Sequence, residues 1–550
     1  MSAAASSRFQ PVLRTLGRSD GGGSRRIGVD AQLTALAVLF FLGLTVWWLT
    51  QETRVPDFDS AEHTFFSFAV HDEIARGALT APFTEFNTYP PLGHLIGGLA
   101  MFVGGESTAS AILALNLVFV PLLAAGCYGA GRCVAGPRAG LLAALFALGA
   151  PMIVSEAHEV YLDPLQAAFV AAAVWGILAS RRFELVGASA LAGLAAGLGM
   201  MAKETTPVFL AGILLVSLAR GGWRRWQGVG AFALAAAVIA GPLYVYHRTE
   251  LHQLFLAHTS QANGAEPNPL GGTYPPSWSL KSLGWYFWDA ANIQLRAGLL
   301  LLFVAGTFVA IARCVRRWSP ENLYPEVLGG AFVSWLGMTW LTHKDPRYDI
   351  AALVYAAVLG TAWIATAGPR LRRVLTAALL VVVAASVASV AFGLGGAGYQ
   401  VRVALPGAYD KGPLGARYVT LYSTQGWLRG APEHNDGNVL ALMRALRRAG
   451  VQKIGFCCVN PPDFSIAGLH VLTHEAGLVD GGTSSAELAA LGPRDVFLLL
   501  HAPVPGDPPP CQKLLDGTGI YAELGSPFIG PFSTFKFICP GHHPAIYGHL

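Results

Sequence analysis

Long apolar runs alternate with short polar loops along the first 400 residues of the chain. Most runs hold about 20 residues, enough for a helix to cross the roughly 30 Å hydrocarbon core of a bilayer. A content of 53% hydrophobic and 13% charged residues also argues against a soluble enzyme. We expect about eleven transmembrane helices, at 31–50, 108–131, 139–154, 164–180, 185–201, 205–219, 227–246, 293–312, 324–342, 348–367 and 374–395.

One further apolar run, at 91–104, is too short to count with these spans. It holds about 14 residues and follows Tyr89-Pro90-Pro91, which is typical of a helix at the membrane surface. Counting it as a span would invert the side of every later loop. We therefore predict a juxtamembrane helix here.

The charges predict the orientation of the spans. With the N-terminus inside, the predicted inner loops hold most of the Lys and Arg residues between 1 and 399, and all of these are Arg. That bias is the positive-inside pattern. Since Met1 to Asp30 is polar and a full-length span follows, we expect a cytoplasmic tail at 1–30 and a retained signal anchor, without a cleaved signal.

The composition also indicates the setting and the partners. The net charge of +4 is carried by Arg in inner loops, which indicates contact with anionic membrane lipids and not with nucleic acid. An Ala-, Gly- and Arg-rich sequence is typical of a high-GC bacterium. We therefore expect a multi-pass protein of the bacterial plasma (inner) membrane.

The pattern changes near residue 400. Beyond the transmembrane part, at 31–399, the sequence predicts an extracytoplasmic α/β domain at 400–550 with helices at 439–449 and 484–491 and strands at 451–459, 495–501 and 533–539. This domain carries four cysteines, Cys457, Cys458, Cys511 and Cys539. They fit either disulfides, with Cys511–Cys539 the preferred pair, or buried free thiols.

Acidic residues gather on the predicted outer side. The first outer loop carries Asp57, Asp59 and Glu62 directly after a span, where a carboxylate can act as general base at the membrane interface. They can equally be ordinary loop acids. A divalent cation is possible on the Asp57–Asp59 pair, but two carboxylates are a weak metal signal. We assign no metal ligands and expect no required cofactor.

The second outer loop ends on Glu159 and Asp163. Asp163 opens the next span, so its carboxylate lies near the head-group plane, where an ionisable group is costly unless it is paired or functional. The alternative is structural, because Asp163 precedes Pro164 and can cap the helix.

Four basic or titratable residues also end spans on the outer side, against the positive-inside bias: Lys203, His343, Lys344 and Arg347. A lipid-linked phosphate in the outer leaflet needs such donors, and Arg can bind it bidentately. Salt bridges to Glu204 and Asp345 are the alternative for these cations. His343 is more typical of a hydrogen bonder at a helix end.

Five segments, in order, resemble the membrane glycosyltransferases of the GT-C fold, in the branch of the protein O-mannosyltransferases (dolichyl-phosphate-mannose-protein mannosyltransferases) and the lipid A aminoarabinose transferases. The resemblance covers roughly residues 30–400. The segments are Phe58-Asp59, Tyr89-Pro90-Pro91-Leu92, Tyr161-Leu162-Asp163-Pro164-Leu165, Gly193 to Lys203, and Lys344-Asp345-Pro346-Arg347-Tyr348.

The resemblance implies a mainly α GT-C fold and transfer of a sugar from a polyprenyl-phosphate donor on the extracytoplasmic side. The acceptor can be a glycan, a lipid or a protein. The resemblance matches Asp59 to the catalytic base and Asp163 to a second active-site acid. Lys203, Lys344 and Arg347 fall in segments that approach the donor phosphate.

Two departures from the family pattern affect this assignment. The family often has Asp-Glu where this chain has Asp59-Ser60, with the Glu displaced to Glu62, which leaves the base open between Asp57 and Asp59. It often has Lys where this chain has Tyr89. We predict that Tyr89, Glu62, Glu159 and His343 contribute to substrate binding.

The leading hypothesis is therefore an enzyme, a hexosyl- or pentosyltransferase of the cell envelope that needs only to deprotonate an acceptor hydroxyl and stabilise a lipid phosphate. The alternative is a transporter or flippase of lipid-linked glycans. That alternative predicts charged mid-membrane positions and repeated halves, and the sequence shows neither pattern.

Overall fold

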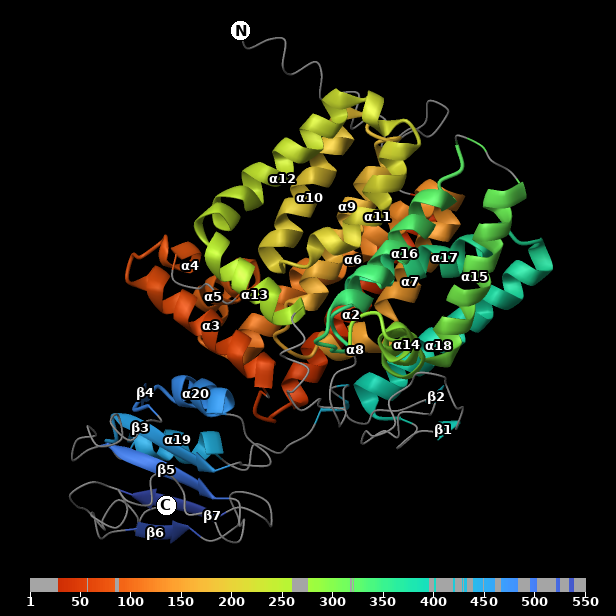
Figure 1. Cartoon of the computed structure of the whole chain (residues 1–550). Coiled ribbons are helices and arrows are strands. Elements are labelled where there is room, and N and C mark those ends of the chain that lie inside the picture. The colour runs from red at the N-terminus through yellow and green to blue at the C-terminus, as the bar shows by residue number, and fades with distance from the viewer. Residues whose placement is uncertain are drawn as a thin grey trace. The chain divides into compact units, whose positions relative to one another are not determined.

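The protein was analysed as a computed structural model that describes residues 28–56, 58–84, 89–259, 276–316, 319, 321–394, 400–401, 419–420, 428, 430–432, 439–448, 450–459, 466–482, 495–501, 521–524 and 534–538. This part of the chain is mainly helical (Figure 1). It forms two compact units. Unit 1 comprises Met1–Trp48, Thr80–Gly93 and Leu115–Ala431, and unit 2 comprises Leu49–Leu79, His94–Ala114 and Pro432–Leu550.

Unit 1 is a helical bundle. Its elements are α2 (Val29–Gln51), α4 (Ala81–Thr84), α6 (Thr108–Ala135, whose first turns belong to unit 2), α7 (Pro137–Leu148), α8 (Pro151–Glu156), α9 (Asp163–Ala179), α10 (Val186–Ala202), α11 (Thr206–Ala219), η1 (Gly222–Arg224), α12 (Trp226–Tyr246), α13 (Arg248–Thr259), α14 (Leu280–Asp289), η3 (Ala290–Gln294), α15 (Arg296–Arg316), α16 (Tyr324–Trp340), η4 (Ile350–Ala352), α17 (Leu353–Ala365), α18 (Pro369–Phe392), β1 (Gln400–Val401) and β2 (Val419–Thr420).

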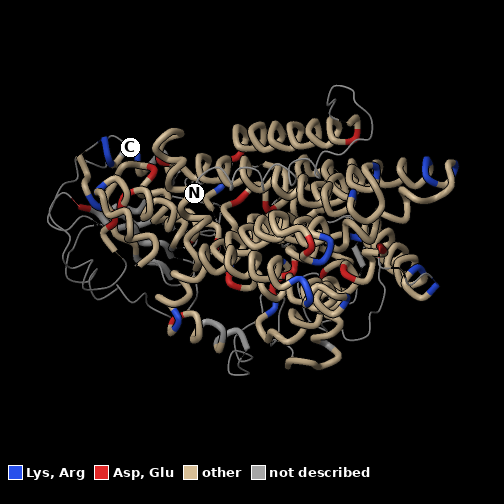
Figure 2. Tube along the Cα trace, turned by 90° about the horizontal axis from the view of Figure 1, so that it is seen from above, with Lys and Arg blue, Asp and Glu red and all other residues tan. Residues whose placement is uncertain are grey.

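Each of the predicted apolar runs is helical in the structure. Among the described residues, five helices are long and apolar enough to cross a membrane, namely α2, α6, α12, α15 and α18. Others, such as α9, α10 and α11, are apolar but shorter. Long stretches of helix carry no charged residue (tan in Figure 2). The count of eleven spans stays a prediction.

Small residues allow the helices of unit 1 to pack closely. A Cβ added to Gly193 on α10 would lie 2.2 Å from the carbonyl oxygen of Phe232 on α12, and these two helices run side by side in Figure 1. Gly212 on α11 lies equally close to α16. A Cβ added to Gly212 would lie 2.1 Å from the carbonyl oxygen of Gly329. In lipid, the hydrophobic effect does not drive helices together, so close backbone approach and van der Waals contact stabilise their packing.

A buried charge network ties the predicted inner ends of these helices together. Arg182 Nε donates to Glu326 Oε1 at 2.7 Å, and Arg220 Nη1 donates to Glu326 Oε2 at 2.6 Å. The Glu326 side chain is only 1% exposed. The turn that presents Arg182 is strained, since Arg181, Arg182 and Phe183 all have positive φ, between 54° and 67°. The network therefore holds a turn that the backbone alone disfavours.

Unit 2 combines two helices with the C-terminal α/β domain. Its elements are α3 (Phe58–Ala75), α5 (Leu92–Gly104, which begins in unit 1), α19 (Val439–Arg448), β3 (Lys453–Val459), α20 (Ile466–Glu475), β4 (Val479–Asp480), β5 (Val496–His501), β6 (Tyr521–Leu524) and β7 (Thr534–Ile538). The sheet order is β4-β3-β5-β7-β6. β3 pairs in parallel with β4 and β5, and β7 pairs antiparallel with β5 and β6.

The helices of unit 2 pack on one another and on the domain. A Cβ added to Gly98 on α5 would lie 2.7 Å from the backbone oxygen of Ser67 on α3, so these two helices touch through their backbones. His63 Nδ1 and His94 Nε2 lie 3.1 Å apart across the same contact. α20 packs against α3. The short run at 91–104 is thus a helix of 13 residues, as predicted.

Most predicted elements of the C-terminal domain are present. The helix at 439–449 and the strands at 451–459, 495–501 and 533–539 correspond to α19, β3, β5 and β7. The predicted helix at 484–491, together with Cys511 and Cys539, lies outside the described residues. α20, β4 and β6 were not predicted. The three-part division at residues 30 and 399 stays a prediction, and the compact units cut across it because α3 contacts α20 of the C-terminal domain.

We predict that Glu326→Ala destabilises the protein by about 3–5 kcal/mol, because it leaves two buried guanidinium groups without their carboxylate. The measurement is the thermal unfolding midpoint of the detergent-solubilised chain. Glu184→Ala is the control, since its pair with Arg225 spans 3.6 Å and both side chains are about half exposed. Equal midpoints for the two variants would contradict the prediction.

Candidate active site

The motif that ends at Lys203 is positioned by helix packing. Gly193 and Gly197 bring α10 against α12, and Gly199 faces Thr206 and Phe169 at contact distance. α10 ends at Ala202, and Lys203 follows in extended conformation. The glycines of this segment therefore place Lys203 at one end of the bundle, facing the start of α9.

Lys203 pairs with Asp163. Lys203 Nζ donates to Asp163 Oδ1 at 2.5 Å, and both residues are buried. Asp163 lies in the first turn of α9, one residue after Leu162, which occupies the N-cap position. The alternative interpretation of Asp163 as a helix cap is therefore wrong, and its carboxylate serves the ion pair instead. The partner of Lys203 is Asp163 and not Glu204, the partner that the alternative salt-bridge interpretation named.

Arg347 pairs with Asp345 within the loop that follows α16. Arg347 Nε donates to Asp345 Oδ1 and Nη2 donates to Oδ2, each at 2.9 Å, so the pair is bidentate. The backbone N–H of Arg347 also donates to Asp345 Oδ1 at 2.9 Å. Burial raises the pKa of Asp345, but the charge and hydrogen bonds of Arg347 outweigh it, so the net pKa lies below the usual value. Asp345 is a carboxylate at neutral pH.

Two aromatic rings connect these pairs. Arg347 Cζ lies 4.5 Å from the centre of the Tyr161 ring, and Lys203 Nζ lies 4.5 Å from the centre of the Tyr348 ring. Tyr161 belongs to the segment of Asp163, and Tyr348 follows Arg347. Each cation thus has a carboxylate on one side and the face of a ring on another, and both contacts attract a positive charge. The three motif segments interlock in one cluster.

Two further acids belong to the cluster. Glu156 ends α8 and is 2% exposed. Burial raises its pKa well above the usual value, Arg347 opposes this, and Asp163 and Glu159 add to it. The surroundings of Glu156 therefore favour its neutral form. Glu159 is half-buried beside it.

Lys344 has a different environment from the other two cations. Its Nζ donates to the backbone oxygens of Met338 at 2.6 Å and Thr339 at 3.1 Å, at the carbonyl end of α16. It also lies 5.0 Å from the centre of the Tyr286 ring. Burial lowers its pKa to about 7, although Asp349 opposes the shift. A neutral amine retains two N–H donors, the number that these carbonyls accept. The predicted phosphate contact of Lys344 stays a prediction.

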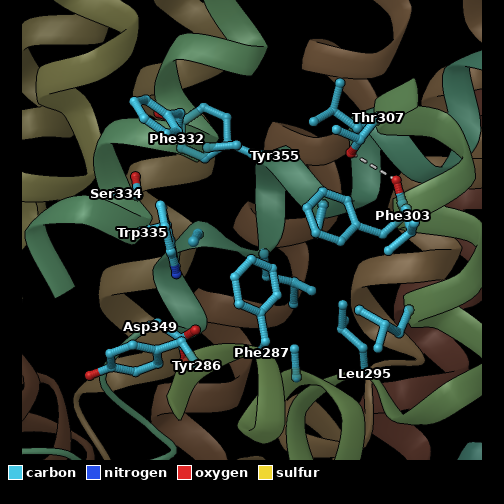
Figure 3. Close-up of a pocket in the computed structure, with 18 of the residues that line it drawn as sticks. Tyr286, Phe287, Leu295, Phe303, Thr307, Phe332, Ser334, Trp335, Asp349 and Tyr355 are labelled. Carbon is cyan, nitrogen blue, oxygen red and sulfur yellow. Dashed lines mark hydrogen bonds between the residues drawn. The ribbon is translucent and has the colours of Figure 1, made fainter. Parts of the chain in front are cut away.

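An apolar cavity of about 540 Å³ lies between α15, α16 and α17, close to this loop. Its walls include Phe303, Phe332 and Leu359. Asp349 and Tyr286 line it as well, and Figure 3 shows these two side by side at one end of the view, away from Phe332. Asp349 accepts a hydrogen bond from Gln294. The cavity is therefore apolar with a polar end, and that end lies two residues from Arg347 along the chain.

The acids of the first outer segment lie in unit 2. Asp59 occupies the first turn of α3, where a helix N-terminus stabilises a carboxylate. Glu62 lies one turn further along. Burial, and then the charge of Asp59, raise the pKa of Glu62. Asp57 lies outside the described residues, so the choice between Asp57 and Asp59 as base stays open.

The remaining predicted residues are in unit 1. Tyr89 is half-buried directly before Pro90. The ring of His343 stacks on that of Tyr348 with centroids 5.8 Å apart and an angle of 29°. His343 is thus in contact with the cluster through Tyr348. The predicted roles of both residues stay predictions.

The structure brings together Asp163, Glu159, Lys203 and Arg347, which the sequence singled out from separate segments. The sequence analysis did not single out Glu156, Tyr161 and Tyr348 as site residues. Tyr161 and Tyr348 are the aromatic members of the third and fifth motif segments, so a signal for them was present. Glu156 had none beyond its place in an outer loop.

Comparison with known proteins supports the assignment of the fold. The family model for dolichyl-phosphate-mannose-protein mannosyltransferase matches residues 88–245. ArnT from Cupriavidus metallidurans bound to undecaprenyl phosphate superposes with a TM-score of 0.59 and 14% identity, over 92% of this chain and 97% of that chain. The apo state of the same ArnT gives 0.57 and 15%, over 92% and 98%. No curated protein sequence matches the chain.

The fold is therefore the GT-C fold of membrane glycosyltransferases. Within that class the chain resembles the branch of the protein O-mannosyltransferases and ArnT, as the sequence motifs indicated.

We predict a pH-dependent stability difference between the wild-type protein and Lys344→Met. A lysine with a folded pKa of about 7 binds fewer protons than the same lysine in the unfolded chain at pH values between 7 and its ordinary pKa of 10.5. Stability contributed by Lys344 is therefore least below about pH 7 and rises above it. The unfolding midpoint of the wild type should rise relative to the variant as pH increases through this window.

The control for this series is Lys453→Met, because the Lys453 side chain is exposed on β3. The difference between its unfolding midpoint and that of the wild type should be the same at every pH. If the midpoint difference between the wild type and Lys344→Met is also independent of pH, burial does not shift the pKa of Lys344.

Proposed function

We propose that this protein transfers a sugar from a polyprenyl-phosphate donor to an acceptor hydroxyl on the extracytoplasmic side of a bacterial plasma membrane. The observation that carries the proposal is the cluster of Asp163–Lys203 and Asp345–Arg347 beside an apolar cavity. A lipid phosphate needs fixed cations for its head and an apolar surface for its chain. The chain provides both near one loop.

The leaving group determines what the cations do. When the bond between the anomeric carbon and the phosphate oxygen breaks, the electron pair remains on the phosphate, so its negative charge increases. Arg347 and Lys203 are placed by Asp345 and Asp163, and fixed donors of this kind stabilise developing charge without reorganising. Lys344, if charged, adds to the positive potential of the same loop.

The apolar cavity suits the chain of the donor. Its walls are hydrophobic side chains of α15, α16 and α17, and its polar end lies next to the segment of Arg347. An isoprenoid chain in the cavity would place its phosphate near that segment. Ligand sites of this kind are largely apolar with a few placed polar groups.

The acceptor must lose a proton as its oxygen attacks the anomeric carbon. We assign this step to Asp59, with Asp57 as the alternative. Asp163 would orient the acceptor or support the base, and Tyr89, Glu62, Glu159 and His343 would contact the substrates. The reaction balances without a redox cofactor, and a divalent cation on the outer carboxylates remains compatible with it.

We predict that Asp59→Asn lowers the turnover number by roughly 100-fold or more while donor binding is retained, since Asn keeps the shape but cannot accept the proton. The measurement is transfer of a radiolabelled sugar from polyprenyl phosphate to cell-envelope acceptors. Asp57→Asn is assayed in parallel, and Asp30→Asn, whose partner is Arg138, is the control. If Asp57→Asn alone is inactive, Asp57 is the base. Full activity in both variants would remove the first outer segment from the mechanism.

We predict the opposite kinetic pattern for Arg347→Ala. The loss of a charged hydrogen-bond donor of about 1.5–3 kcal/mol should weaken donor binding by roughly 10- to 100-fold. Donor affinity is measured by titrating undecaprenyl phosphate into the purified protein. Arg225→Ala, at an exposed arginine, is the control. Unchanged affinity for Arg347→Ala would exclude this cluster as the phosphate site.

A further inference from the structure

Four potential metal ligands from three segments of unit 2 converge at one place. His71 and Asp72 lie near the end of α3, Glu106 lies between α5 and α6, and His474 lies in the last turn of α20. The ligand atoms of His71, Asp72 and Glu106 all lie within 4.8 Å of one another. His474 Nε2 lies 3.5 Å from Glu106 Oε2 and 4.0 Å from Asp72 Oδ2.

These separations are close to those of a tetrahedral zinc site. With Zn–N and Zn–O distances near 2.1 Å, neighbouring ligand atoms lie about 3.4 Å apart. The distance from His71 Nδ1 to Asp72 Oδ1 is 3.2 Å, and the two distances from His474 Nε2, 3.5 Å and 4.0 Å, are both longer than the ideal value. Two imidazoles and two carboxylates form a set of ligands that suits Zn²⁺.

The two imidazoles are held in place by aromatic rings. The His474 ring meets the Phe68 ring edge-on with centroids 4.1 Å apart, and the His71 ring lies 4.3 Å from that of Phe102. His474 Nε2 is buried and has no hydrogen-bond partner, although it points toward the two carboxylates. A cation held between this nitrogen and the two carboxylates would satisfy all three groups.

A neighbouring contact fixes the end of α20 at the same place. Glu475 Oε1 accepts hydrogen bonds from the backbone nitrogen and the hydroxyl of Thr108, at 2.8 Å and 2.7 Å. Thr108 begins α6, two residues after Glu106. The position of His474 relative to Glu106 is therefore set by an independent interaction.

We propose that His71, Asp72, Glu106 and His474 bind one Zn²⁺ that joins α3, the α5–α6 turn and α20. The ion would replace weak contacts between partly exposed side chains with four coordinate bonds. Asp72 and Glu106 are about half exposed, at 47% and 48%, which leaves a path for the ion to enter. The site ties the C-terminal domain to the helix that carries Asp59.

The zinc would have a structural role and no part in sugar transfer. Asp59 and His71 are twelve positions apart on α3, which in an α-helix corresponds to about 18 Å. A metal at His71 is thus too far from Asp59 to contact a reacting group there. The proposal therefore stands or falls independently of the proposed function.

The test uses the full-length protein in detergent, stripped with EDTA and dialysed. Zinc is titrated by calorimetry, and bound metal is counted by mass spectrometry after desalting. We expect one tight site in the wild type, with a tetrahedral absorption band when Co²⁺ replaces Zn²⁺. His474→Gln should weaken zinc binding by roughly 100-fold or more, since even outer-shell changes cost 10–100-fold. His252→Gln, at an exposed histidine of α13, should bind as the wild type does.

A second pair of variants covers the case in which His474→Gln fails to fold. Glu106→Gln changes an exposed turn and should also lose the site, whereas Glu73→Gln removes the same charge beside Asp72 and should keep it. Hydrogen exchange at α20 should slow on addition of zinc in the wild type and in Glu73→Gln only. The proposal is overturned if the wild type binds no zinc, or if Glu106→Gln binds it as tightly as Glu73→Gln does.

Discussion

The chemistry of this protein depends on two buried ion pairs that share aromatic rings. Asp163 holds Lys203 and Asp345 holds Arg347, and each cation also faces a tyrosine from the other segment. A buried cation without a partner would be costly or neutral. Because each cation is paired with a carboxylate, the bundle can keep cations at a position where the hydrophobic surroundings would otherwise exclude them.

Helix packing makes that arrangement possible. The glycines of α10 let its backbone touch α12 and α9, which determines where Lys203 emerges. The network of Glu326 with Arg182 and Arg220 holds the predicted opposite end of the same helices. The bundle is thus fixed at both ends by charges and along its length by small residues. This rigidity allows a loop such as 341–349 to present its side chains in one arrangement.

The three cations of the predicted donor site differ in their surroundings. Lys203 and Arg347 are stabilised as cations by carboxylates, whereas Lys344 lies against two carbonyls and a ring and loses basicity by burial. The same residue type in neighbouring motifs therefore has different chemical properties. We infer that Arg347 and Lys203 are the stronger candidates for the phosphate contact, and that Lys344 first of all secures the end of α16.

The sequence by itself determined the helices, the short juxtamembrane segment, most strands of the C-terminal domain and the motif residues of the site. These features follow from hydrophobic period, length and residue type, which are local properties. Only the tertiary structure decided that Asp163 pairs with Lys203 and does not cap its helix. It also decided that burial raises the pKa of Glu156, that Lys344 donates to backbone carbonyls and that α20 brings His474 to α3. These features depend on which segments contact one another and how deeply they are buried. Local sequence patterns do not determine contacts between segments that are far apart in the chain.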